Sequence, residues 1–496
     1  MASWCDLEHL GWSAAAAATT ALLVWLGSGL HPLWPLMWLA PLPVLLVATR
    51  ASGRLTAIVA FVAWFLGGCN LWRYLRGSLG MPGAAVLSIL VPMALAFVGD
   101  VLLFRALVRR QACWSAVFAF PAGWVAFEYV VSLSTSGGTV GSLAYSQLAF
   151  LPILQSASLA GPWGISFLLF LFPAAVAVGA HLYGTAPKRA TRVLGVALAV
   201  IAAALAFGWA RLAAPEGGAR VKAGLLASDA HGHANVQGEG APTLRLLQSY
   251  ADRAAQLGAE GVKVVVLPEK IGIVGPADLR GADATLQSVA DRTGVTIVAG
   301  LIHKTARADY NEARVYAPNR PVLTYHKEHL LPHFESRLTP GTALTVVPRP
   351  SGKWGVAICK DMDFTGLSRR YGKAGAGLLL VPGWDFTVDW VYHGHIALMR
   401  GVEDGCSVVR AAKDGSLYAS DNRGRILAEV RSDSAPFAEL VSEVPAAHAK
   451  TVYLVLGNSF AWLAMALTLG ALLRLLRPWD RSRWERAEAA GKAPGA

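Results

Sequence analysis

The stretch GVAICKDMDF, residues 355–364, places a cysteine directly after a short apolar run. Residues 356–358 are typical of a buried strand, and Cys359 follows them, with Lys360 and Asp361 next in the chain. In α/β domains, chemistry gathers at the carboxyl ends of strands. A lone cysteine after an apolar run is more often a small core residue, so the rest of the sequence must decide whether this thiol is aimed at a substrate.

Two more reactive side chains end apolar runs in the same half of the chain. Glu269 ends VVVLPE and Lys327 ends LTYHK. A carboxylate can take the thiol proton, the thiolate can attack a carbonyl, and an ammonium can stabilise the oxyanion that forms. Taken singly, a Glu or Lys after a strand is usually a solvated loop residue. Their shared placement with Cys359 makes the three a candidate catalytic set.

The segment around these residues has the sequence pattern of an α/β domain. Amphipathic helix patterns, such as residues 243–261, lie between short apolar runs. The runs that we interpret as buried strands are 263–270, 294–301, 321–327, 354–360 and 376–386.

The whole chain, in contrast, has the composition of a membrane protein. Of its 496 residues, 54% are hydrophobic and only 15% are charged, against about 25% charged in soluble domains. A membrane-crossing helix needs about 20 apolar residues. Eight stretches qualify, and because no Lys or Arg precedes the first, we interpret it as a retained helix. They lie near 11–30, 32–49, 55–72, 84–108, 113–132, 164–183, 191–212 and 452–475.

Basic residues in the short loops predict the orientation. If the N-terminus is cytoplasmic, the basic loops all fall on one side, and only Arg73 and Arg76 break the pattern. We therefore predict a membrane domain of seven spans over 1–215 and an extracytoplasmic catalytic domain over 216–448. A last span over 449–478 and a cytoplasmic tail over 479–496 complete the chain. The basic sites are Arg50, Arg54, Arg109, Arg110, Lys188, Arg189, Arg192, Arg474, Arg477, Arg481, Arg483 and Arg486.

Residues 220–430 resemble the nitrilase, or carbon–nitrogen hydrolase, superfamily. The Glu–Lys–Cys triad of that superfamily matches Glu269 in LPEK, Lys327 in YHKEHLLPHFE and Cys359 in AICKD. A further glutamate often holds the lysine there, and Glu335 fits that position. The resemblance implies a four-layer α-β-β-α sandwich beside the membrane helical bundle.

With the membrane part included, nearly the whole chain resembles the apolipoprotein N-acyltransferase family. The stretches GWVAFEYV (123–130), LAYSQL (143–148) and 151–169 look like that family's sequence before its sixth span. The family takes an acyl chain from a phospholipid, usually phosphatidylethanolamine, and forms a thioester on the cysteine. It then passes the acyl group to the free α-amino group of a diacylglyceryl-cysteine at a lipoprotein N-terminus. The resemblance implies an inner-membrane enzyme.

Carried onto this chain, the resemblance assigns a role to each triad residue. Glu269 would be the general base and later the acid, Cys359 the nucleophile, and Lys327 with the backbone N–H of Lys360 would hold the oxyanion. One departure stands out, because the family usually has Tyr and then Glu after the cysteine, where this chain has Lys360 and Asp361. Lys360 could lower the thiol pKa, meet a lipid phosphate, or be an ordinary solvated lysine.

Two other functions remain open. The same triad with water as the acceptor would make a membrane-tethered amidase or lipid hydrolase. The second alternative is a transporter or a non-catalytic lipid-binding protein, in which the triad would have no catalytic use. We expect no nucleic-acid partner despite the net charge of +12, since the basic residues flank membrane spans. We also expect no cofactor, and a monomer.

Other polar residues that could suggest a site are weighed against a structural or surface role. His326, His329 and His333 have helical spacing, but Pro332 argues against a continuous helix, and we predict no metal site. YHGH, residues 392–395, is expected at the surface. Intramembrane acids are functional candidates. Asp100 could pair with Arg105, and Glu128 could serve the structure or a substrate gate.

Overall fold

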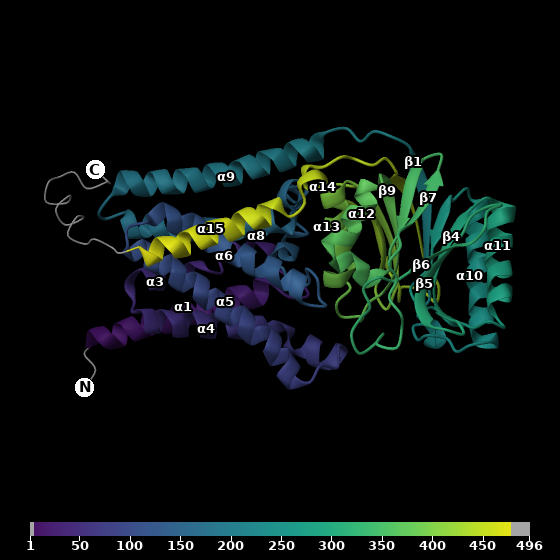
Figure 1. Ribbon diagram of the computed structural model, residues 1–496, viewed down its shortest axis with the longest axis horizontal. Helices are drawn as coiled ribbons and strands as arrows, with labels where there is room; N and C mark the ends of the chain where they lie inside the picture. The colour runs from purple at the N-terminus through teal and green to yellow at the C-terminus, as the bar shows by residue number, and fades with distance from the viewer. Residues whose placement is uncertain (1–3, 478–496) are drawn as a thin grey trace.

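The computed structural model describes residues 4–477, which form an apolar helical bundle at one end and a two-sheet sandwich at the other (Figure 1). The chain changes from helices to strands between Ala213 and Arg220. It returns to the bundle after Pro445, so both ends of the described chain lie at the end of the bundle far from the sheets (Figure 1).

The bundle is built from helices that match the apolar stretches of the sequence. Among the described residues, six segments are long and apolar enough to cross a membrane, and two apolar segments, Gly11–Gly27 and Trp34–Arg50, are shorter. This makes the chain a membrane protein. The helices are α1 (Trp4–Gly27), α2 (Trp34–Met37), α3 (Leu42–Arg50), α4 (Gly53–Gly68), α5 (Gly83–Arg109), α6 (Cys113–Ser134), α7 (Leu151–Leu154), α8 (Ala157–Leu182), α9 (Pro187–Ala213) and α15 (Ser459–Leu476).

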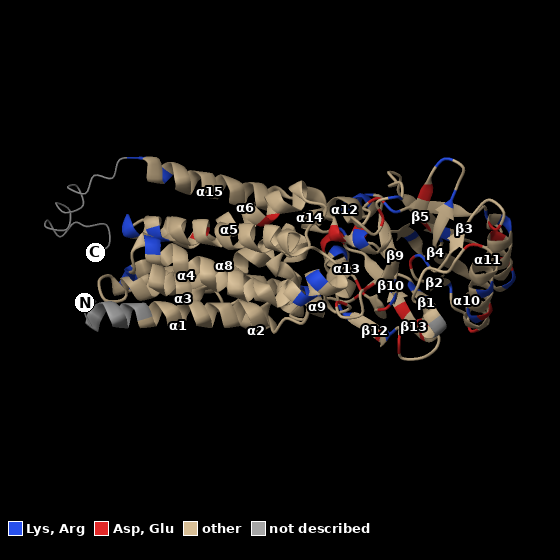
Figure 2. Cartoon of the chain, turned by 90° about the horizontal axis from the view of Figure 1, so that it is seen from below, with Lys and Arg blue, Asp and Glu red and all other residues tan. Residues whose placement is uncertain are grey.

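Charge is scarce along the bundle and gathers at its ends (Figure 2). Asp100 is one buried exception in α5, and the prediction that it pairs with Arg105 is wrong. Its Oδ2 atom has no hydrogen-bond partner, while Arg105 donates to the carbonyl of Ala51 at 2.8 Å. Residues five apart on a helix do not share a face, which explains why the two side chains diverge. Of the basic residues after the last span, Arg481, Arg483 and Arg486 lie outside the described residues.

Two sheets stack face to face in the other half, as the resemblance implied. The order of the first sheet is β13-β1-β2-β4-β5-β6, with β3 paired to β4, and the order of the second is β12-β11-β10-β9-β8-β7. The first contains β1 (Arg220–Ala227), β2 (Val264–Val266), β3 (Ile273–Val274), β4 (Thr296–Lys304), β5 (Asp309–Tyr316), β6 (Leu323–His326) and β13 (Ala438–Pro445). The second contains β7 (Thr345–Arg349), β8 (Gly352–Val356), β9 (Ala376–Trp384), β10 (Ser407–Lys413), β11 (Ser416–Ser420) and β12 (Ile426–Arg431).

Helices cover the outer face of each sheet and complete the α-β-β-α sandwich. Helices α10 (Ala241–Ala259) and α11 (Leu279–Thr293) pack on the first sheet. Helices α12 (Thr365–Lys373) and α13 (Tyr392–Asp404) pack on the second. The opposite face of α13 joins the core of the bundle through Ile396, Met399 and Val402. A short helix, α14 (Val452–Leu456), leads back to the bundle. Because α13 packs on both the second sheet and the bundle, the second sheet is the one that faces the bundle (Figure 1).

Candidate active site

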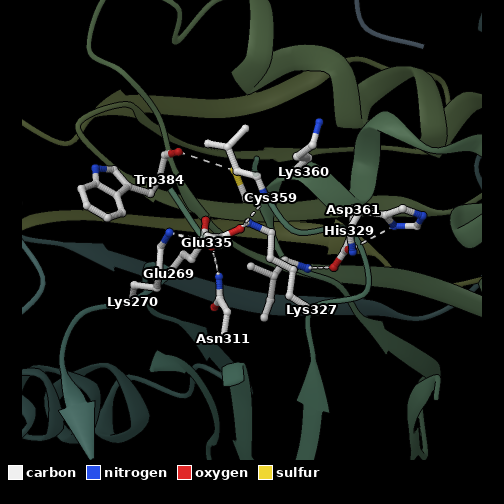
Figure 3. A network of polar contacts seen from close by, with 12 residues as sticks. Glu269, Lys270, Asn311, Lys327, His329, Glu335, Cys359, Lys360, Asp361 and Trp384 are labelled. Carbon is white, nitrogen blue, oxygen red and sulfur yellow. Dashed lines mark hydrogen bonds and ion pairs between the residues drawn. The ribbon is translucent and has the colours of Figure 1, made fainter. Parts of the chain in front are cut away.

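Three strand ends bring Glu269, Lys327 and Cys359 together between the sheets. Glu269 follows β2 and Lys327 follows β6 in the first sheet, while Cys359 follows β8 in the facing sheet. The carboxylate and the ammonium are almost fully buried, at 1% and 2% exposed. Lys327 Nζ donates to Glu269 Oε1 at 2.8 Å, and the thiol lies beside this pair (Figure 3). The arrangement can carry out nucleophilic attack on a carbonyl.

The backbone at Cys359 is in the left-handed region, with φ of 41°. A non-glycine residue rarely adopts this conformation, and such strain is found mostly at functional sites. It turns the chain sharply out of β8 into the short helix η5 (Cys359–Asp363). The thiol donates to the carbonyl of Trp384 at 3.5 Å. Burial, and then the charge of Glu269, raise the pKa of the Cys359 thiol to about 12, so a base is required to form the thiolate.

Glu335 holds the catalytic lysine from the other side. Its Oε2 atom accepts from Lys327 Nζ at 2.9 Å and from the backbone N–H of Leu331 at 2.7 Å. Burial alone would raise the pKa of this carboxyl, but the ammoniums of Lys327 and Lys270 hold it well below its usual range. Burial would lower the pKa of Lys327, and the two carboxylates raise it instead. Both groups therefore stay charged at neutral pH.

Asp361 lies behind the nucleophile and touches no part of the triad. Fully buried, it accepts from Tyr325 Oη at 2.8 Å, from the N–H of Ile358 at 3.0 Å and from the N–H of His329 at 2.9 Å. Tyr325 belongs to β6, His329 to the segment that follows Lys327, and Ile358 lies after β8, directly before Cys359. Asp361 therefore connects the turn at Cys359, here called the nucleophile turn, to β6, the strand that precedes Lys327.

Lys360 turns away from the charged cluster (Figure 3). Its Nζ lies 3.4 Å from Asp363 Oδ2 and 5.5 Å from the centre of the Phe364 ring. Its side chain is only 10% exposed, so the interpretation of an ordinary solvated lysine is wrong. Both Lys360 and Asp363 line the cavity described below.

Sequence analysis missed several residues of this site. Asn311, in the middle of β5, donates from Nδ2 to Glu269 and to Glu335, at 2.6 Å each. Lys270 directly follows the triad glutamate, and its Nζ lies 2.7 Å from Glu335 Oε1. Lys413, at the end of β10, donates to the carbonyl of Lys270 at 2.8 Å. The sequence did offer a signal for Lys270, because it is a charged residue next to Glu269. No sequence signal pointed to Asn311 or Lys413.

The prediction that YHGH lies at the surface is wrong for both histidines, because the side chains of His393 and His395 are only 23% and 12% exposed. His393 Nδ1 pairs with Asp389 at 2.6 Å, and Tyr74 of the bundle donates to the same carboxylate at 2.6 Å. The three side chains line the cavity, which the local pattern could not indicate because Tyr74 lies far away in the sequence. Of the other histidines, His326 pairs with Glu312 and His329 with Asp361. No group of metal-binding residues forms in the described part of the chain.

A cavity of ≈ 980 Å³ connects the triad to the bundle. Glu269, Lys327 and Cys359 line it on the sandwich side. Its opposite wall is formed by apolar side chains of the helices, among them Leu71, Ile89, Met93, Phe127 and Val131. Glu128 also lines it, but this carboxylate is satisfied, because it accepts from Ser142, Ser166, Trp124 and the N–H of Leu143. Glu128 therefore holds the loop after α6 in place.

Comparison with known proteins matches both halves of the chain. Residues 20–175 match the family Apolipoprotein N-acyltransferase N-terminal domain, and residues 230–462 match the family Carbon-nitrogen hydrolase. An apolipoprotein N-acyltransferase of Geobacter metallireducens is 27% identical over 477 residues, which cover 87% of this chain and 89% of the relative. The chain belongs to the apolipoprotein N-acyltransferase family.

The similarity to this family spans the membrane part as well as the sandwich. An apolipoprotein N-acyltransferase of Vibrio vulnificus is 22% identical over 92% of this chain and 96% of its own length. A deaminated glutathione amidase of Synechocystis is 30% identical, over 35% of this chain and 73% of the relative. The amidase therefore resembles a third of this chain, whereas the acyltransferases resemble nearly all of it.

Proposed function

We propose that this protein is a membrane N-acyltransferase that moves a fatty acyl group from a phospholipid to the N-terminal amine of a diacylglyceryl-cysteine in apolipoproteins. The observation that carries the proposal is the cavity, because it joins a Glu–Lys–Cys set to an apolar wall of membrane helices. Both substrates carry acyl chains, and each buried CH₂ contributes about 0.8 kcal/mol to binding. A water-soluble amide would need no such wall.

In the first half-reaction, Glu269 takes the proton from Cys359 and the thiolate attacks the ester carbonyl of the lipid. Lys327 and the backbone N–H of Lys360 stabilise the oxyanion. The lysophospholipid leaves with the proton from Glu269, and the acyl group stays on sulfur as a thioester. In the second half-reaction, the α-amine attacks the thioester, Glu269 accepts its proton, and the proton returns to the thiol as the amide product leaves.

Supporting residues keep this set in place. Glu335 and Asn311 fix Lys327 and Glu269, and Asp361 fixes the nucleophile turn. Asp361 is one methylene shorter than the glutamate that is usual in the family. It therefore positions the nucleophile and transfers no proton. No cofactor is needed for either half-reaction.

The membrane arrangement is part of the proposal. We infer eight spans, with 1–215 and 449–478 in the inner membrane, the catalytic domain 216–448 outside, and the tail 479–496 in the cytoplasm. Basic residues at the end of the bundle opposite the sandwich support this orientation (Figure 2). The protein acts as a monomer.

Intact-mass measurement after incubation with phospholipid tests the thioester. The wild-type chain should gain one acyl mass that hydroxylamine removes, and Cys359→Ala should gain none while remaining in the membrane. Adding a diacylglyceryl-cysteine peptide with a free amine should speed decay of the acyl-enzyme, because a bound amine reacts at an effective concentration that can reach ~10⁵ M.

The same peptide with an acetylated amine should not speed decay and serves as the control. Wild-type product should be the N-acylated peptide, with lysophospholipid formed in equal amount. Release of free fatty acid at the same rate with and without peptide would replace the transferase by the lipid hydrolase.

A further inference from the structure

The catalytic cluster contains a second buried ammonium, that of Lys270. Its Nζ lies 2.7 Å from Glu335 Oε1 and 3.7 Å from Glu269 Oε1 (Figure 3). The residue is 7% exposed, so this charge is not a solvated one. Lys327 contacts the same two carboxylates, at 2.9 and 2.8 Å.

The position of Lys270 is fixed by contacts that do not involve the triad. Its backbone is in the left-handed region, with φ of 48°. Lys413 Nζ donates to its carbonyl at 2.8 Å, and the ammoniums of Lys270 and Lys413 lie 4.9 and 3.9 Å from the centre of the Trp384 ring. Backbone strain of this kind persists only where the surrounding structure holds it, and here Lys413 of the facing sheet holds Lys270. We therefore regard the position of Lys270 as part of the site.

The charge count explains what a second cation would do. Two carboxylates, Glu269 and Glu335, face two ammoniums, Lys327 and Lys270, so these four groups carry no net charge at rest. Lys413 donates to the carbonyl of Lys270 and to neither carboxylate, and burial lowers its pKa to about 7. When the Cys359 proton moves to Glu269, the cluster becomes positive beside the new thiolate, which favours the charged sulfur. Without Lys270 the resting cluster would be negative, and Lys327 alone would serve both carboxylates.

We propose that Lys270 is a positioning residue of the acylation step: it neutralises Glu335, so that Lys327 is available for the acyl oxygen and the Cys359 thiol ionises more readily. This inference deepens the proposed function and rests on the same triad. The downward shift of the Glu335 pKa by Lys327 and Lys270 agrees with the pairing. The chemical step is the loss of the S–H proton to the Glu269 carboxylate, with the electron pair left on sulfur.

Alkylation by iodoacetamide measures thiol ionisation without any lipid substrate. The second-order rate at Cys359 is followed at pH 8 by peptide mass analysis, with Cys359→Ala as the blank for the other cysteines. Lys270→Met should slow alkylation about tenfold, which corresponds to about one unit in the effective pKa. Lys270→Arg, which keeps the charge, should stay within about threefold of the wild type.

The decisive variant is Lys270→Met combined with Glu335→Gln. Removing both charges returns the cluster to neutrality, so the double variant should recover most of the lost rate, a coupling that a double-mutant cycle measures. Lys304→Met, which removes an exposed lysine paired with Glu239, is the matched control and should change nothing.

Two results would overturn the proposal: wild-type rates in Lys270→Met, or a double variant as slow as the single one, which would show that the loss is structural. Lys270→Gln provides a second uncharged side chain should the methionine variant not fold. A wild-type chain that alkylates as expected but never gains an acyl mass would defeat the proposed function, while the effect of Lys270 on ionisation of the Cys359 thiol would remain.

Discussion

At the scale of single residues, this site shows that a buried acid can serve catalysis without touching the reacting atoms. Asp361 accepts from two stretches of chain, one with Tyr325 and His329 around Lys327 and one with Ile358, which converge only because β6 and β8 lie in facing sheets. A carboxylate accepts several hydrogen bonds at once, and such charge-assisted bonds are roughly twice as strong as neutral ones. Its shorter side chain fits between backbone N–H groups that lie 2.9 and 3.0 Å away.

Replacing this acid should loosen the nucleophile. Asp361→Asn keeps the size but loses the charge and places an NH₂ group against N–H donors, so we expect a loss of about 1–3 kcal/mol in the free energy of unfolding. The initial rate of thioester formation should fall as well. Thermal unfolding in detergent and the burst of acylation measure the two effects. Asp433→Asn, at an exposed acid paired with Arg431, is the control, and equal losses in both variants would refute this role.

At the scale of elements, the loop after α6 connects the membrane helices to the nucleophile turn. Thr139 donates from its N–H and from its hydroxyl to the carbonyl of Asp363, at 2.9 and 2.7 Å. Gly138 lies against the same carbonyl, with φ of 57°. Glu128 holds the far end of the loop through Ser142. The last residue of η5 is therefore fixed by a loop of the bundle.

Gly138→Ala should disturb this contact. A Cβ atom there would lie 2.6 Å from the Asp363 carbonyl oxygen, and the left-handed backbone adds strain of about 1–3 kcal/mol. We expect acylation to slow about tenfold or more while the protein remains in the membrane. At Gly137 the nearest atom to an added Cβ is Thr135 Oγ1 at 3.5 Å, so Gly137→Ala is the matched control. Equal rates in the two variants would show that the loop does not position the turn.

Asp389, between Trp384 and α13, forms a second connection between the two halves, because it pairs with Tyr74 of the bundle and with His393 of α13. Burial alone would lower the pKa of His393, but the carboxylate of Asp389 raises it above its usual value. Burial would raise the pKa of Asp389, and His393 lowers it to about 2. The ion pair therefore contributes fully to stability between about pH 4, the ordinary aspartate value, and about pH 6.5, the ordinary histidine value. The contribution is lost as the pH rises through the folded-state pKa of His393 and as it falls towards the folded-state pKa of Asp389.

His393→Gln should remove this pH dependence. The variant should unfold at a lower temperature than the wild type at pH 6, and the difference should shrink towards pH 9, where the wild-type imidazole is neutral. Thermal unfolding in buffered detergent across this range measures it. A difference that stays constant with pH would mean that the histidine contributes packing and no charge.

At the scale of the whole molecule, the distribution of charge predicts which side of the membrane each end occupies. Both described ends of the chain lie at the basic end of the bundle, and the sandwich lies at the other (Figures 1 and 2). Positive loops are retained in the cytoplasm. We therefore predict that the cavity lies at the outer-leaflet end of the bundle, within reach of a lipoprotein precursor that carries two acyl chains.

Cysteine accessibility in intact cells tests this orientation. A cysteine at exposed Glu260, in the turn after α10, should react with a membrane-impermeant maleimide, and one at exposed Lys188, at the start of α9, should react only after lysis. The parent chain with its native cysteines gives the background. The reverse pattern would mean that the catalytic domain faces the cytoplasm.

The sequence by itself determined the parts of this protein that depend on local pattern. Apolar runs located the membrane helices and the strands β2, β4, β6, β8 and β9, because burial in lipid or between sheets requires apolar side chains over a fixed length. The other strands were not predicted. The ends of three such runs also located Glu269, Lys327 and Cys359, since a side chain that follows a strand is placed at the edge of its sheet.

Only the tertiary structure decided what surrounds those three residues. Lys413 reaches Lys270 because β10 pairs with β9 at Trp384 and because the second sheet faces the first. Asn311 meets two glutamates because β5 lies beside β4 and β6. His393 meets Tyr74, which comes from the bundle, at 3.1 Å. Each contact joins residues far apart in the chain, and their separation in space is set by sheet register and by docking of the two halves, which no local pattern records.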